Sequence, residues 1–156
     1  MGIRAAFFLP FARSAVQEEG EKRVRLSRVS GDGSPAGVLS SAISNATVRL
    51  LSEYTGRGPT KARTYITGDL ITVVLQDTLT KGERNLVRNG QGSLVLQSRK
   101  AYQKTMGADL VARVEELTGR RVLAFLSDNH IDPDYAVESF VLERRGDAAA
   151  EQPQTP

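Results

Sequence analysis

Apolar residues recur every three or four positions in two long stretches of the chain, which is the spacing of one face of a helix. The first stretch runs from about Val38 to Tyr54, and its apolar face consists of Leu39, Ile43, Ala46, Leu50 and Tyr54. The second runs from about Ser93 to Thr118, with Val95, Tyr102, Met106, Leu110, Val114 and Leu117 on the face we expect to be buried. Gly56 and Pro59 should end the first helix, and Gly119 the second.

Between these helices the period changes to two, which predicts a β-hairpin. Ala62–Thr67 and Leu70–Gln76 flank the pair Gly68-Asp69, and a two-residue loop that opens with Gly suits a type II′ turn. Such a turn pairs Ile66 with Ile71 and places six residues on one face: Ala62, Thr64, Ile66, Ile71, Val73 and Leu75. The other face holds Arg63, Tyr65, Thr67, Leu70, Thr72 and Val74. The first face is the more apolar, so we expect helices to cover it.

A short helix and a second pair of strands complete the pattern. Thr80 and Glu83 have the spacing of a capping box, in which each side chain binds a free backbone N–H at the start of a helix. The strands Arg121–Ser127 and Tyr135–Glu143 should be joined by Asp128–Asp134, whose Asn, Asp and Pro content is typical of a turn.

The element order α-β-β-α-α-β-β predicts an α+β fold. We expect a two-layer sandwich, in which a four-stranded, mostly antiparallel sheet has its helices on one face. This domain should occupy residues 38–145. Residues 1–37 are interpreted as a flexible leader and linker, since their end is rich in Gly and Ser. Residues 146–156, rich in Ala, Gln and Pro, are interpreted as a disordered tail.

Composition restricts the compartment and the chemistry. The chain of 156 residues has no Cys, which excludes disulfides, thiolate metal sites and thiol nucleophiles. Its net charge of +3 is mild. No apolar run approaches the ~20 residues of a membrane helix. The short apolar run in Met1–Ala12 contains Pro10 and is followed by Arg13, so a flexible leader is favoured over a signal peptide. We expect a cytoplasmic protein, free or peripheral at the inner face of the membrane.

The only histidine lies in a segment rich in carboxylates. His130 is close in sequence to Asp128, Asp132 and Asp134, which is the composition of a calcium loop. An EF-hand loop counted from Asp128 requires Gly at position six and Glu at position twelve, where this chain has Pro133 and Ser139. A solvated turn is favoured over a cation site. No Gly-x-Ser-x-Gly motif is present either, so the sequence predicts no catalytic residue, cofactor or metal site.

Two surfaces are candidates for binding a partner. Six basic residues in and after the short helix could form one patch: Lys81, Arg84, Arg88, Arg99, Lys100 and Lys104. We single out Arg84, Arg88, Arg99 and Lys100 as a docking site for an acidic partner or a phosphate surface, although a solvated helix exterior is the favoured alternative. The second surface is the uncovered sheet face with Tyr65, Leu70 and Val74, which is more apolar than a free surface requires.

A series of short stretches follows in chain order within residues 54–143: Gly56-Arg57-Gly58-Pro59 with Thr60-Lys61, Tyr65-Ile66, Asp69-Leu70-Ile71, Leu79-Thr80 with Glu83, Thr118-Gly119-Arg120-Arg121-Val122, Asp128, and Phe140-Val141-Leu142. In these stretches the chain resembles a bacterial family named for MpsC, a component of a Na⁺-translocating, membrane-potential-generating system. The resemblance implies association with a cation or bicarbonate transport system in the cell envelope. It supplies no catalytic residue.

These observations favour a non-enzymatic accessory or binding subunit. It would act with protein partners, among them membrane ion-transport subunits or further copies of itself. The alternative is a small cytosolic regulatory module that binds nucleic acid or an anionic ligand through its basic helices. Because the positive charge is mild, nucleic acid is the less favoured partner.

Overall fold

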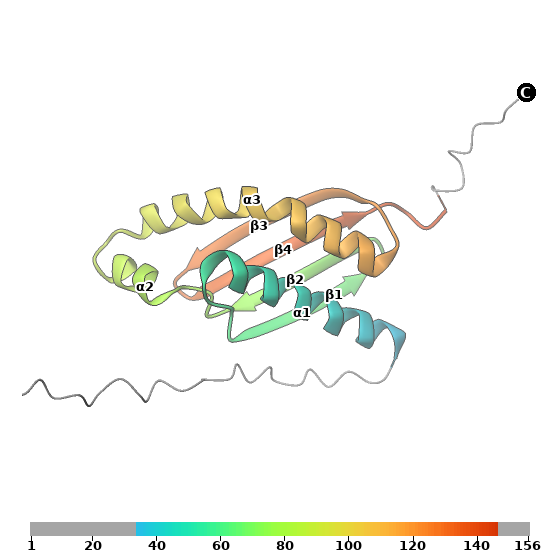
Figure 1. The fold of residues 1–156 in the computed structure, drawn as a ribbon, viewed down its shortest axis with the longest axis horizontal. Coiled ribbons are helices and arrows are strands. Elements are labelled where there is room, and N and C mark those ends of the chain that lie inside the picture. The colour runs from blue at the N-terminus through green and yellow to red at the C-terminus, as the bar shows by residue number, and fades with distance from the viewer. Residues whose placement is uncertain (1–33, 147–156) are drawn as a thin grey trace, which may run out of the picture.

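A computed structural model describes residues 34–146 of the chain. Its elements, in order, are α1 (Pro35–Thr55), β1 (Lys61–Thr67), β2 (Leu70–Gln76), α2 (Lys81–Arg88), α3 (Gly92–Thr118), β3 (Val122–Ile131) and β4 (Asp134–Leu142). The strands form one four-stranded sheet in the order β1-β2-β4-β3, and every neighbouring pair is antiparallel (Figure 1). This order confirms the predicted element sequence and α+β class.

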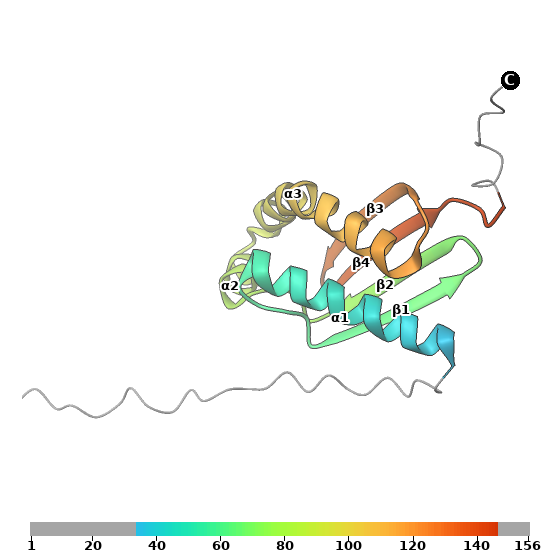
Figure 2. The same cartoon turned by 45° about the vertical axis from the view of Figure 1, so that its right-hand side comes forward.

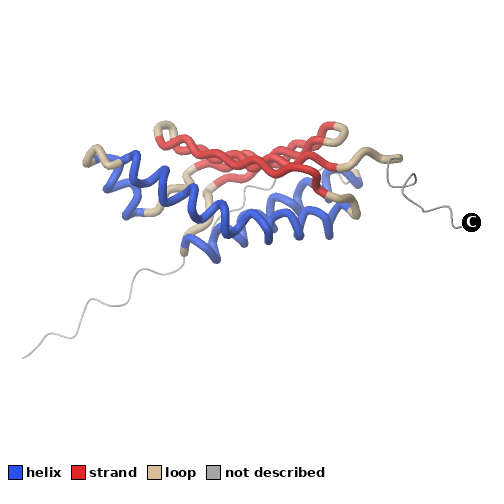
Figure 3. Tube along the Cα trace, turned by 90° about the horizontal axis from the view of Figure 1, so that it is seen from above, coloured by secondary structure: helices blue, strands red, loops and turns tan. Residues whose placement is uncertain are grey.

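The sheet and the helices form two layers. All three described helices lie on the same side of the sheet, as the view from above shows (Figure 3). α1 packs on β1 and β2, α3 packs on β3, and the two long helices contact each other (Figure 2). The opposite side of the sheet has no element of the described chain over it (Figure 3). The predicted two-layer sandwich with an uncovered sheet face is confirmed.

The first hairpin has the predicted register. Ile66 pairs with Ile71, and the pairing continues along the strands to Lys61 and Gln76. Gly68 adopts a φ of 60°, a backbone conformation that a residue with a Cβ rarely takes and that the first turn position requires. Both sheet faces of the hairpin are therefore those that the alternation predicts.

The core lies between the helices and the covered sheet face. Phe140 on β4 is fully buried and contacts the ring of Phe125, with ring centroids 5.0 Å apart. The other buried apolar residues of this core are Ile43, Leu51, Ile71, Val73, Leu75, Met106, Leu110, Val114, Ala136 and Leu142. The predicted buried faces of both long helices supply most of their residues to it; Ala46 and Tyr102 do not belong to it.

Tyr102 was expected in the core but is 47% exposed. Its helix buries Arg99 instead, at 6% exposure, and the polar contacts of that guanidinium fix the rotation of the N-terminal half of α3. The buried stripe of this half of α3 runs through Val95, Arg99 and Met106, and Tyr102 lies at its exposed margin. The prediction was wrong because a period-counting argument assigns every charged side chain to the exterior.

Two boundaries also differ from expectation. α1 begins at Pro35, three residues before the predicted start, because the Ser34 hydroxyl accepts a hydrogen bond from the Gly37 N–H and caps the helix. The predicted loop Asp128–Asp134 is mostly strand: β3 continues to Ile131, and β4 starts at Asp134. The expected leader (apart from its last residues) and the expected tail lie outside the described residues.

Candidate functional site: the open sheet face and the α3–β3 cleft

The uncovered side of the sheet, which we call the open sheet face, is built from four rows of side chains. Each row contains one residue from every strand, in the order β1, β2, β4, β3, and follows from the strand register. The first three rows are Thr67, Leu70, Val141, Ala124; Tyr65, Thr72, Ser139, Leu126; and Arg63, Val74, Val137, Asp128. The outermost row, at the turn of the second hairpin, contains Lys61, Gln76, Tyr135 and His130. The middle strands of this face alternate apolar side chains with uncharged polar ones, and the charged residues lie on the edge strands.

The large apolar side chains of this face are well exposed. Tyr65 is 50% exposed and Leu70 44%, whereas Val74 is half-buried between its neighbours. The second hairpin adds Leu126 at 58%, opposite Tyr65 in the same row. Contiguous exposed apolar patches on a sheet usually mark a protein interface. The face is thus larger than the first hairpin alone predicted.

The four basic candidates do not form one surface. Arg99 is buried, so it offers no charge to a partner. Arg84 is half-buried and its Nη1 donates to the Leu79 carbonyl at 2.7 Å, while Arg88 is exposed beside Asn85. Lys100 is exposed and lies at the cleft described below. Of the predicted docking patch, only Arg88 and Lys100 are exposed enough to meet a partner.

The buried Arg99 holds together three separate parts of the chain. Its guanidinium forms a two-pronged ion pair with Glu83 on α2, at 2.9 and 3.0 Å. It also donates to the hydroxyl and carbonyl of Thr78, at 2.8 and 2.9 Å, and to Asn129 Oδ1 on β3 at 3.1 Å. Burial raises the pKa of Glu83, but the hydrogen bonds from Arg99 and the Thr80 backbone outweigh burial and lower it below its ordinary value. This is a structural network, since every donor has an internal partner.

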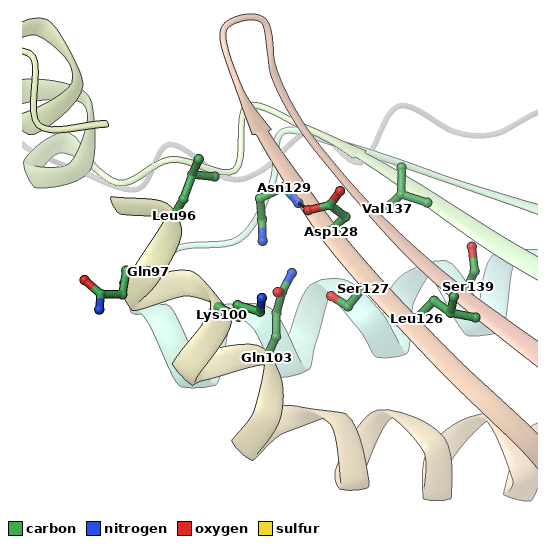
Figure 4. Close-up of a pocket in the computed structure, with 10 residues that line it drawn as sticks. All are labelled: Leu96, Gln97, Lys100, Gln103, Leu126, Ser127, Asp128, Asn129, Val137 and Ser139. Carbon is green, nitrogen blue, oxygen red and sulfur yellow. Dashed lines mark hydrogen bonds between the residues drawn. The ribbon is translucent and has the colours of Figure 1, made fainter. Parts of the chain in front are cut away.

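A cleft of about 710 Å³ separates the N-terminal half of α3 from β3 (Figure 4). Leu96, Gln97, Lys100 and Gln103 line it from the helix, and Ser127 and Asn129 from the strand. Gln103 and Ser127 point toward one another across it (Figure 4). The cleft also reaches around the edge of β3 to Leu126 and Asp128, so it adjoins the open sheet face.

A buried carboxyl group lies next to this cleft. Glu138 on β4 is 1% exposed and is the cross-strand partner of Ser127 on the covered face. The Glu138 Oε2 and the Ser127 Oγ are both buried without a hydrogen-bond partner in the described part of the chain. Burial raises the pKa of Glu138 to about 7, and the neighbouring Ser127 hydroxyl, although outside hydrogen-bond geometry, partly opposes this rise. The group therefore exchanges a proton near neutral pH.

The side chains of the polar segment around His130 have separate partners. The His130 ring lies on the open sheet face, with Nδ1 2.8 Å from the Pro133 carbonyl oxygen. Asp134 is committed elsewhere: its carboxylate accepts from the Thr78 N–H and hydroxyl and from the Leu79 N–H, at 2.8 to 3.0 Å. Within residues 34–146, no three His, Asp or Glu side chains are placed to hold a metal ion.

A comparison with models of protein families assigns the chain to a family. The model described as "Na⁺-translocating membrane potential-generating system (MpsC)" matches residues 36–144. The chain belongs to the MpsC family. The match covers every helix and strand except the first residue of α1, and it confirms the resemblance seen in the sequence. Membership suggests a role in that system and partners among its components.

The other comparisons give no further guide to the MpsC-type domain. No curated protein and no solved structure matches the chain. In the described residues, no helix has the length and apolar character that crossing a bilayer requires.

Sequence reasoning missed two features of the site for which a signal was present. Alternation along β4 places Glu138 on the same face as Ala136 and Phe140, which are core residues, and so indicates a buried carboxyl group. The same alternation along β3 places Leu126 on the uncovered side, because its neighbour Phe125 is on the side that packs against the core. Both residues could have been found by assigning faces in the second hairpin as in the first.

Proposed function

We propose that the protein is a non-enzymatic accessory subunit of the Na⁺-translocating, membrane-potential-generating system for which its family is named. It acts by binding protein partners, at a cytoplasmic location. Family membership supports the connection with that system. The open sheet face supports the binding role, and it is the single observation on which this role rests.

The physical reason lies in the composition of the face. Tyr65, Leu70 and Leu126 would each be more stable in contact with protein than with water, at ~25 cal/mol per Å² of apolar area buried. The charged residues Arg63 and Asp128 end the neighbouring row, at the two edges of the sheet, where they can pair with charges of a partner. The alternative, an anion-binding module, loses support because Arg99 is buried and Arg84 is bonded internally.

The test is capture of membrane partners by the full chain. Tagged wild-type protein is mixed with detergent-solubilised membranes of the source organism, and captured integral membrane proteins are identified by mass spectrometry. The double variant Tyr65→Ser/Leu126→Ser should lose most of the capture. The double variant Leu94→Ser/Tyr102→Ser is the matched control, since it removes a comparably exposed Leu and Tyr from α3.

The two variants give opposite predictions. Retained capture by the open-face variant, with loss in the α3 variant, would contradict the proposal and move the binding surface to the helices. If neither wild type nor control captures an integral membrane protein, the assignment to a membrane system is contradicted.

A further inference from the structure

We propose that a second copy of this chain covers the open sheet face, in a symmetric homodimer with its two-fold axis along the strands between β2 and β4. The inference rests on the proposed function and refines it: the face binds a second copy, and the components of the membrane system bind the assembled dimer, so that variants without the dimer also lose their capture. The observation that supports it is the distribution of side chains over that face. The face is complementary to itself after rotation about an axis parallel to the strands, and less so after rotation about an axis across the strands.

The rotation exchanges the two halves of the sheet. Turning the sheet over about an axis parallel to its strands places β1 over β3 of the second copy and β2 over β4, and it keeps each row opposite itself. Two sheets packed in this way lie ~10 Å apart with their strands within ~30° of each other. Long side chains of facing rows then meet.

The charged edges match under this rotation. Arg63 and Asp128 end the same row, on β1 and β3 respectively. Arg63 of one copy therefore faces Asp128 of the other, and the symmetry repeats the pair at the opposite edge. Neither side chain forms an ion pair with another residue of the described chain. Both charges are available for a partner.

The apolar positions match as well. Tyr65 faces Leu126 of the second copy in the next row, and Leu70 faces Val141 in the row beyond it. Rotation about an axis across the strands gives a poorer fit. It would place Leu126 against Asp128 and Leu70 against Gln76, so that an apolar side chain desolvates a polar one.

The size of the face is sufficient for a dimer of modest affinity. Four strands ~4.8 Å apart and seven residues of ~3.4 Å each cover roughly 450 Å² in plan, or roughly 900 Å² over two copies. Accessible area exceeds plan area, so the contact reaches the ~1,000 Å² expected of a specific interface. In such a dimer the helices of both copies point outward.

The test is a charge exchange, measured on the full chain by sedimentation velocity over a range of concentrations. Arg63→Glu and Asp128→Arg should each raise the dimer dissociation constant about tenfold or more, since each creates two like-charge contacts per dimer. The double variant Arg63→Glu/Asp128→Arg should restore dimerisation. Arg49→Glu, at an exposed position on α1, is the control and should leave it unchanged. Urea midpoints of the dilute proteins report whether each variant is folded.

Several results would overturn the dimer. One is a wild-type chain that stays monomeric at every concentration. A second is a dimer that both single variants form as well as wild type, because it must then use another surface. A third is a failure of the double variant Arg63→Glu/Asp128→Arg to dimerise.

Other results separate the dimer from the proposed function. If the wild-type chain is monomeric but its open-face variant still loses membrane capture, the proposed function stands and another protein covers the face. If the wild-type chain forms the dimer but the open-face variant captures membrane proteins as well as wild type does, the proposed role of the face in membrane binding is contradicted. The dimer itself is not.

Discussion

Replacement of the buried Glu138 by Gln should stabilise the protein at neutral and alkaline pH and leave it unchanged in acid. The carboxyl group is 1% exposed, and its Oε2 has no hydrogen-bond partner within residues 34–146. Gln has nearly the same shape but carries no charge. The variant therefore isolates the free-energy cost of ionising this one group inside the core.

The sign and size follow from the two protonation equilibria. Burial raises the pKa of Glu138 from an ordinary 4.5 to about 7, so the folded chain holds this proton more tightly than the unfolded chain. The stabilisation is complete below pH 4.5 and is lost as the pH rises to about 7. At ~1.4 kcal/mol for each pKa unit, the loss is about 3 kcal/mol. Glu138→Gln should avoid it.

The assay is urea unfolding of both proteins at several pH values between 4.5 and 8.5. Because Glu83 and other groups also titrate, the quantity to plot is the difference in unfolding free energy between variant and wild type. It should be near zero at the acid end and rise to about 3 kcal/mol above pH 7. Glu53→Gln, at an exposed position on α1, is the matched control and should give a flat line. A flat line for Glu138→Gln would refute the reasoning and mean that water reaches the carboxylate.

Two further substitutions test the packing of α3. Leu110→Ala removes a fully buried side chain from the core and should lower the unfolding free energy by ~2–5 kcal/mol; an unchanged urea midpoint would contradict the assigned buried face. Arg99→Ala leaves the half-buried Glu83 and the buried Thr78 without their partner and should cost ~3 kcal/mol, whereas Ala at the exposed Arg88 should change the midpoint little. Equal effects of the two arginine substitutions would mean that the Arg99 network is not structural.

Local signals in the sequence were sufficient for most of the fold. In the first hairpin, Gly68 fixes the turn and the alternation fixes the faces, so the register follows from about fifteen consecutive residues. The capping box of Thr80 and Glu83 likewise depends on neighbours in sequence, and both of its hydrogen bonds are formed. These elements were predictable because the interactions that define them are short in range.

Features that depend on distant residues were not predictable in the same way. The segment after Asp128 has a turn-like composition, but pairing with β4 extends it as strand to Ile131. Arg99 has its partners on α2, in the loop before α2 and on β3, and no periodicity reveals that they converge. The predicted basic patch failed at this residue for that reason. The open sheet face was predicted from one hairpin, and its second half emerged only when strand order placed β4 beside β2.

The most direct test of the central claim, that protein covers the open sheet face, is oxidative footprinting of two tyrosines. Tyr65 on that face and Tyr102 on the helical side are 50% and 47% exposed in the single chain, so hydroxyl radicals should label them almost equally if nothing covers either residue. We predict that labelling of Tyr65 falls several-fold below that of Tyr102 in two conditions: at concentrations where the full chain is dimeric by sedimentation, and in membrane extracts. Variants that separate the partners should restore it. Equal labelling of Tyr65 and Tyr102 under all of these conditions would contradict the account.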